Sequence, residues 1–264
     1  MNNPSSLTPD IFRLTVPFED IFTTVFVVKT PDGALLFDTA TYASDIDDYI
    51  VPMLNELGID ASALKYVLIS HSHRDHAGGL ERFMQLYPDT CIISRSSALR
   101  EKFSGSGVLA PEDGEAILGD LRIITVPGHS GDCISLYDTR TKTMLTGDCL
   151  QLFGIYGSGY WGANIGAPVD HLAAVEKLRG LDVETVIASH DYHPCGHIAS
   201  GKAEISRYYD ECANALYAIR DAIKASGTDD MAELSKKYNE TSGLPKVSER
   251  IFTSVLKAME AGRI

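Results

Sequence analysis

The segment Ile69–Gly79 reads Ile-Ser-His-Ser-His-Arg-Asp-His-Ala-Gly-Gly and carries the densest functional pattern of the chain. It places three histidines and one aspartate within six residues, whereas the whole chain of 264 residues contains 8 histidines. An apolar strand predicted over 65–70 delivers these side chains onto a loop, and Gly78-Gly79 allows a sharp turn into a closely packed helix. Because imidazole and carboxylate groups are preferred ligands of zinc and related metals, the segment predicts a metal site.

Three further candidates follow other predicted strands. His129 comes after a strand ending in Val-Pro-Gly, Asp148 follows Thr-Gly, and His190 follows the apolar run Thr-Val-Ile-Ala-Ser. A single histidine or aspartate at a strand end is more often a cap or a buried hydrogen-bonding group. One metal cannot readily accept four adjacent loop ligands and a nucleophile as well, so two neighbouring metal sites are easier to build.

The remaining pattern alternates strands and helices and then becomes helical. Strands are predicted over 11–16, 21–30, 34–37, 65–70, 90–94, 121–126, 133–138, 143–146 and 185–189. Helices are predicted over 45–57, 78–86 and 170–179, from about 198 onward, and over 230–239 and 246–258. Asp38 and Ser70-His71 in the first half correspond to Asp148 and Ser189-His190 in the second. This weak repeat is typical of two stacked ββα halves.

Composition limits the classes of partner. The formal net charge is −13, and the longest basic cluster is Lys236-Lys237, which argues against nucleic acid. No apolar run approaches the ~18–20 residues of a membrane span, and the first residues do not resemble a secretory signal. The five cysteines form no C-x-x-C pair. We therefore expect a cytoplasmic protein with reduced thiols that acts on a small molecule, without a nucleic-acid or membrane partner.

The motif His71-x-His73-x-Asp75-His76, with its downstream partners, resembles the metallo-β-lactamase-fold hydrolase superfamily over roughly residues 11–197. The resemblance implies an α/β fold, a four-layer αββα sandwich of two ββα-type halves over 1–197. A helical C-terminal extension over 198–264 would pack on the same domain. The implied ligands are His71, His73 and His129 for one metal, and Asp75, His76 and His190 for the other, with Asp148 bridging both. Asp38 would orient the metal loop without binding the metal itself.

Hydroxyacylglutathione hydrolases (glyoxalase II) share this ligand set and add C-terminal helices, so they are the nearest analogy. The resemblance implies a dinuclear metal-dependent hydrolase that attacks the carbonyl of a small ester, thioester, lactone or amide. A metal-bridging hydroxide would be the nucleophile. The catalytic candidates are Asp75, Asp148 and His193, the last as a proton donor unless it only hydrogen-bonds nearby. The expected cofactors are two divalent ions, with zinc preferred over iron or manganese.

Three alternatives stay open: β-lactam hydrolysis, a mononuclear iron oxygenase of the same fold, and a non-catalytic ligand-binding or regulatory protein. Secreted β-lactamases require export, and a one-iron oxygenase needs fewer ligands than this chain offers. A regulatory member would show the same ligands, so only measured turnover separates it from an enzyme.

The loop 151–169 is rich in glycine and aromatic residues and directly follows Asp148. Its flexible backbone and flat side chains make it a candidate substrate wall. The pocket candidates are Phe18, Phe153, Tyr156, Tyr160 and Trp161. The competing interpretation is a contact between subunits, so a homodimer through this loop or through the C-terminal helices is a further expectation.

Overall fold

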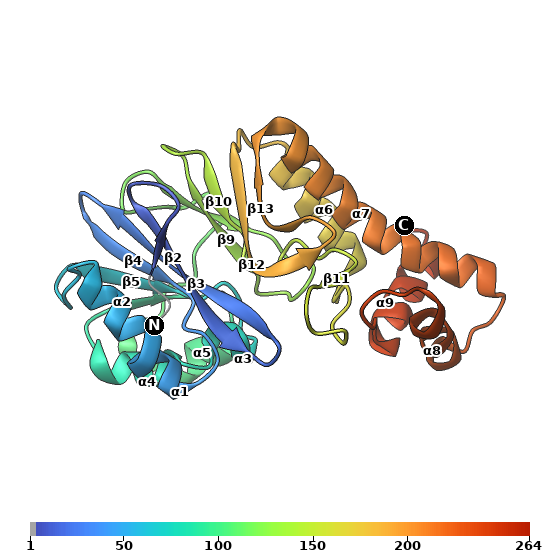
Figure 1. The fold of residues 1–264 in the computed structure, drawn as a ribbon, viewed down its shortest axis with the longest axis horizontal. Coiled ribbons are helices and arrows are strands. Elements are labelled where there is room, and N and C mark those ends of the chain that lie inside the picture. The colour runs from blue at the N-terminus through green and yellow to red at the C-terminus, as the bar shows by residue number, and fades with distance from the viewer. Residues whose placement is uncertain (1–3) are drawn as a thin grey trace. The chain divides into compact units, whose positions relative to one another are not determined.

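The computed structural model describes residues 4–264, whose packing divides the chain into two compact units. The first unit contains the described residues up to Thr125 together with Ile134–Thr141. The second contains Val126–Cys133 and Lys142–Ile264. The strands of the described part form a six-stranded and a seven-stranded sheet, accompanied by helices (Figure 1). The predicted α/β class with two sheets and a helical C-terminal extension is confirmed. The domain boundary at residue 197 stays a prediction.

The six-stranded sheet belongs to the first unit and follows the chain order. Its strands are β1 (Ser5–Ser6), β2 (Ile11–Phe18), β3 (Ile21–Thr30), β4 (Gly33–Phe37), β5 (Leu64–Leu68) and β6 (Cys91–Ile93). Strands β1 to β4 pair antiparallel, whereas β4, β5 and β6 run parallel. Side chains that follow β4 and β5 therefore emerge at one edge of the sheet.

The hairpin between β3 and β4 turns at Thr30-Pro31-Asp32-Gly33, as the turn residues predict. Gly33 has a φ of +137°, and a Cβ atom there would lie 2.6 Å from Lys65 Cγ. The turn thus needs glycine both for its backbone conformation and for the close approach of the neighbouring strand.

Helices of the first unit lie on one face of this sheet (Figure 1). They are α1 (Ala43–Asp45), the π-helical turn η1 (Ile46–Ile50), α2 (Val51–Glu56), α3 (Arg74–Ala77), α4 (Leu80–Leu86), α5 (Ser97–Lys102) and the 3₁₀ turn η2 (Ser104–Ser106). Apolar side chains such as Ile46, Leu54 and Phe83 pack with Leu36 and Val67 of the sheet in one buried cluster. This burial supplies most of the driving force for the unit.

The seven-stranded sheet has members in both units. The first unit contributes β7 (Ala116–Ile117), β8 (Leu121–Thr125) and β9 (Ile134–Asp138), which pair antiparallel in that order. The second contributes β10 (Thr143–Leu145), β11 (Gly154–Ile155), β12 (Thr185–His193) and β13 (Gly196–Ser200). Strand β12 pairs parallel with β10 and antiparallel with β11 and β13.

Several predicted boundaries were wrong, and three of them lie near the candidate site residues or at the start of the C-terminal helices. Strand β5 ends at Leu68 rather than at residue 70, so the metal loop begins earlier. Strand β12 continues past residue 189 to His193, because β13 supplies a partner along its far end, with an irregular register between Ile187 and Tyr192. The helix expected from about 198 begins only at Gly201, since Ile198 pairs with Ile187 in the sheet. The sequence pattern did not reveal that pairing.

Helices of the second unit are α6 (Pro168–Arg179), α7 (Gly201–Ser226), α8 (Met231–Thr241) and α9 (Glu249–Glu260). Pro168 stands at the start of α6, Asp230 caps α8 through two backbone N–H groups, and Gly227 ends α7 with a positive φ. A buried cluster joins α7, α8 and α9 to the loop after β11, through residues such as Leu216, Phe252 and Ile165. Within residues 4–264, no helix has the length and apolarity that a membrane crossing requires.

His171 gives the second unit a measurable pH dependence. Its imidazole is fully buried in α6, and Nε2 donates to the carbonyl oxygen of Cys212 at 3.1 Å. Burial lowers the pKa of His171 below its ordinary value of 6.5, although the carbonyl contact opposes the shift. The unfolded chain therefore takes up a proton near pH 6.5 before the folded chain does. Stability contributed by the neutral ring is lost as the pH falls below that value.

Replacing His171 with glutamine keeps a donor but removes this titration. In chelator-treated protein, we expect the free energy of unfolding to fall more steeply for the parent than for the His171→Gln variant between about pH 7 and about pH 5.5. The difference between the two slopes of unfolding free energy against pH should not exceed about 1.4 kcal/mol per pH unit. Urea titrations at several pH values measure the unfolding free energies. Parallel plots of unfolding free energy against pH for the two proteins would contradict a lowered pKa of His171.

Candidate metal centre

The metal loop follows the end of β5 in the first unit. His71 and His73 lie on the segment between β5 and α3, and α3 itself carries Asp75 and His76. Thr39 on the neighbouring strand end donates its backbone N–H to the His76 carbonyl at 2.7 Å. The backbones also approach closely at Gly78, where a Cβ atom would lie 2.0 Å from the Thr41 carbonyl oxygen. The loop is thus packed directly onto the segment after β4.

Asp38 lies beneath this loop and is fully buried. One carboxylate oxygen accepts the backbone N–H of Ser70 at 2.7 Å, and the other accepts the Ser70 hydroxyl at 2.8 Å. The second oxygen also lies 2.8 Å from His76 Nδ1. Burial raises the pKa of Asp38, while the imidazole of His76 and the Ser70 donors oppose the rise. Asp38 therefore binds the loop at both Ser70 and His76, and its effect on metal binding stays a prediction.

Ser70 connects Asp38 to a second imidazole. Its hydroxyl gives its proton to Asp38 and lies 3.1 Å from His71 Nδ1, so it is placed to accept from that nitrogen. The rings of His71 and His76 have centroids 4.2 Å apart, and those of His71 and His73 are 4.6 Å apart. Such close packing of imidazoles is typical of a metal-binding cluster.

The second unit contributes another set around Asp148. The Asp148 carboxylate lies 3.7 Å from His129 Nε2 and 3.4 Å from His190 Nε2. All three side chains are buried. Asp148 follows β10 by a short turn, and His190 lies in the irregular part of β12. Parallel pairing of these two strands places both residues at the same end of the sheet.

A chain of hydrogen bonds supports this second set. His129 donates from Nδ1 to the carbonyl oxygen of Asn164 at 2.9 Å. The backbone N–H of Asn164 donates to Gln151 Oε1 at 2.9 Å, and the Gln151 amide donates to the Asp148 carbonyl at 2.9 Å. Gln151 also donates to the Tyr192 hydroxyl at 3.1 Å. The buried Gln151 amide thereby links the segments that carry His129 and Asp148.

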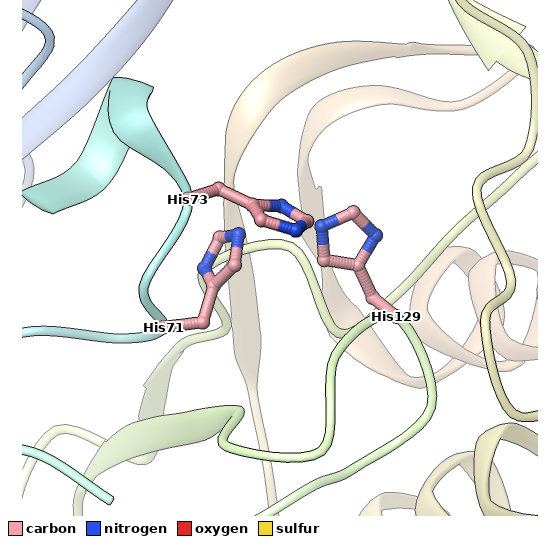
Figure 2. A group of neighbouring side chains, drawn as sticks. All are labelled: His71, His73 and His129. Atoms are coloured by element: carbon pink, nitrogen blue, oxygen red, sulfur yellow. The ribbon is translucent and has the colours of Figure 1, made fainter. Parts of the chain in front are cut away.

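Candidate metal ligands of the described residues form two groups. One consists of His71, His73 and His129, and the other of Asp75, His76, Asp148 and His190. Figure 2 shows the imidazoles of the first group, with His71 and His73 on the segment before α3 and His129 on the loop after β8. These seven residues are those that the resemblance assigns to two metals, although it has Asp148 bridging both, whereas here Asp148 falls in the second group only. The metal binding itself stays a prediction.

The donor chemistry fits a metal ion. In His71, His76 and His129, Nδ1 faces a hydroxyl, a carboxylate and a carbonyl oxygen, respectively. In each ring Nδ1 is thus placed to donate to an oxygen, which leaves Nε2 for a metal ion. A second partner that fixes the tautomer in this way is typical of metal-binding histidines.

The other predicted site residues are spread more widely. His193 ends β12, and its ring lies edge-on to Tyr156 at a centroid distance of 5.2 Å. Phe153 is half-buried and packs against the helical cluster of the second unit, whereas Tyr160 and Trp161 line a cavity there. Phe18 ends β2 and does not line that cavity. The role of His193 and the substrate contacts stay predictions.

Sequence reasoning missed the residues that hold the ligands in place. Ser70 was noted only as part of a Ser-His repeat, and its contact with Asp38 required the pairing of β4 with β5. Asn164 acts through a backbone carbonyl, which leaves no mark in the sequence. Gln151 could have been suspected as a polar residue in an apolar run.

Comparison with known proteins identifies the family. The profile of the Metallo-beta-lactamase superfamily matches residues 19–190, more than half of the chain, so the protein belongs to this superfamily. A solved metallo-beta-lactamase family protein from Thermus thermophilus has the same fold, with a TM-score of 0.68 and 20% identity. The match covers 97% of this chain and 95% of that one.

Curated relatives are more distant and only partly matched. A hydroxyacylglutathione hydrolase of Prochlorococcus marinus is 26% identical over 149 residues, 53% of this chain and 57% of the relative. An atrochrysone carboxyl ACP thioesterase of Emericella nidulans is 26% identical over 190 residues, 71% of this chain and 53% of the relative. The chain thus spans little more than half the length of these relatives.

Proposed function

We propose that the protein is a dinuclear metal-dependent hydrolase that cleaves a small ester, thioester, lactone or amide. The observation that carries this proposal is the division of seven candidate histidine and aspartate ligands into two groups, with Nδ1 of three imidazoles facing an oxygen atom. The names of the relatives, a hydroxyacylglutathione hydrolase and a thioesterase, support an acyl substrate. The preferred ion is zinc, and the same ligands also suit iron or manganese.

The groups that would hold the ions also organise the reaction. A pair of divalent ions supplies a polarised carbonyl and a bound water whose pKa falls from about 15.7 to near 7. Asp75 lies 3.2 Å from His76 Nε2 and is partly exposed, so its carboxylate is placed to orient the nucleophile as well as to bind. His193 would give a proton to the leaving group, with its ring positioned by Tyr156.

Substituting His76 with alanine separates the dinuclear proposal from a one-ion oxygenase. We expect the His76→Ala variant to bind one ion fewer per chain and to lose roughly 100-fold or more in kcat/KM, since the second group loses an imidazole. An oxygenase built on His71, His129 and Asp148 alone would tolerate the change. Elemental analysis and hydrolysis of a thioester panel measure both effects.

The matched control is His171→Gln, which removes a buried imidazole outside both groups. It should keep the ion content and the activity of the parent at neutral pH. If His76→Ala retains full activity with an unchanged ion content, the dinuclear assignment is wrong. If the parent binds two ions and hydrolyses no ester, thioester, lactone or β-lactam, the non-catalytic alternative holds.

A further inference from the structure

A cavity of about 320 Å³ lies in the second unit, between the loop after β11 and the helices α8 and α9. This volume is within the usual range for small-molecule sites. Its lining includes the rings of Tyr160 and Trp161, the basic side chains of Lys246 and Arg250, and the amides of Asn164 and Asn239. Neither the metal loop of the first unit nor His193 lines it.

The loop after β11 packs directly against the segment before α9. The backbone N–H of Gly162 donates to the Lys246 carbonyl at 2.8 Å, and a Cβ atom at Gly162 would lie 2.7 Å from the Pro245 carbonyl oxygen. A Cβ atom at Gly154 would lie 2.4 Å from Pro245 Cγ. Gly154 and Gly162 are therefore required by the contact with the segment before α9, which explains part of the unusual composition of the loop.

The half-buried Asn239 and the buried Ser235 hold the segment before α9 in place. Asn239 accepts the backbone N–H of Val247 at 2.9 Å and donates to the Val247 carbonyl at 3.0 Å. The buried Ser235 hydroxyl donates to the same carbonyl at 2.9 Å. The backbone that carries Lys246 and leads into Arg250 is thus fixed in advance of any ligand.

The basic and aromatic side chains that line the cavity suit a planar anionic ligand. No acidic side chain lines the cavity, although the chain has a net charge of −13. Among residues 4–264, Lys246 has the Tyr160 ring at 5.9 Å and no carboxylate partner, and Arg250 donates to the Asn164 amide oxygen at 2.8 Å. Tyr160 and Trp161 are 58% and 37% exposed and contact each other edge to face with centroids 5.0 Å apart, so each ring keeps exposed surface for a planar group.

The cavity is connected to the metal centre through Asn164. This residue lines the cavity, accepts Arg250 on its side chain and accepts His129 Nδ1 on its backbone carbonyl. Asn164 therefore separates the cavity from His129, on the side of that ring opposite Nε2.

We propose that this cavity is a ligand subsite, distinct from the metal centre, that binds an aromatic carboxylate, with the ring against Tyr160 and Trp161 and the carboxylate at Lys246 and Arg250. The inference goes beyond the proposed hydrolase function, because it is argued from the lining of the cavity alone. It uses residues that lie outside both metal groups.

Trp161 is the only tryptophan of the chain, so its emission reports on the cavity directly. We expect phenylacetate to change this emission with saturation, and phenylacetamide and hexanoate to bind at least about tenfold more weakly, because each lacks one of the two recognised groups. The Lys246→Met variant should lose the preference for phenylacetate over phenylacetamide. The Lys257→Met control, on α9 and outside this cavity, should keep it.

The titration is run on the full chain with the metal present and after chelation. Equal affinities for the three compounds, or an unchanged preference in Lys246→Met, would overturn the subsite. Binding that disappears on chelation would also overturn it, since the carboxylate would then occupy the metal centre. Hydrolysis of a thioester panel is measured separately. An active enzyme without phenylacetate binding rejects only the subsite, whereas binding without turnover rejects the hydrolase.

Discussion

Replacing Asp38 with alanine is expected to lower the affinity for a divalent ion by about 10–100-fold and the free energy of unfolding by about 3 kcal/mol. The carboxylate accepts from the Ser70 backbone, the Ser70 hydroxyl and His76 Nδ1 in a fully buried site. Its removal leaves buried donors without an acceptor, and each such group costs about 1–3 kcal/mol. The His76 and His71 rings would also lose the contacts that fix their tautomers.

Asp45→Ala is the matched control for this prediction. Asp45 is likewise buried in the first unit and accepts the backbone N–H groups of Thr41 and Tyr42, yet it contacts no candidate ligand. It should lose stability and keep its ion affinity. Competition with a chromophoric chelator measures the affinity, and urea unfolding measures the stability. Equal ion affinities of Asp38→Ala and the parent would show that Asp38 does not support the centre.

A single methyl group at Gly78 should be the most disruptive small change in the metal loop. The added Cβ would lie 2.0 Å from the Thr41 carbonyl oxygen and 2.4 Å from the Arg74 carbonyl oxygen, both of which are backbone atoms. Because neither can rotate away, the backbone of α3 must shift. We expect Gly78→Ala to cost about 3 kcal/mol or more in unfolding free energy, at the upper end of overpacking effects.

Gly105→Ala provides the same substitution in open space, since no atom lies within 4 Å of its added Cβ. Its unfolding free energy should stay within about 0.5 kcal/mol of the parent. Thermal and urea unfolding compare the two variants. If they prove equally stable, the close packing of the loop onto the segment after β4 is not as described.

The sequence predicted most of the sheet and the candidate ligands because both depend on short-range patterns. β-branched runs identified β3 and β12, and the His-x-His-x-Asp-His spacing identified the metal loop. The ends of β12 and α7 were wrong because they depend on β13, whose pairing with β12 is set by tertiary contacts. Local propensity does not contain that information.

The lining of the cavity in the second unit was less predictable for the same reason. Tyr160 and Trp161 were recognised as aromatic residues in a glycine-rich loop, but their partners Lys246 and Arg250 lie more than eighty residues later in the chain. Only the helical packing of the second unit brings them together. Phe153 shows the converse case, because its ring packs in the helical cluster rather than along the cavity.

The hydrogen bonds on Nδ1 of His71, His76 and His129 also have a consequence for conformational entropy. In a flexible site, each side chain that becomes immobile on binding reduces the affinity by about 0.5–1.5 kcal/mol. Here the three rings are already ordered by Ser70, Asp38 and Asn164 when the chain folds. The cost of aligning these side chains therefore appears in the folding free energy of the metal-free chain, and an ion that binds there would meet rings that need not reorganise.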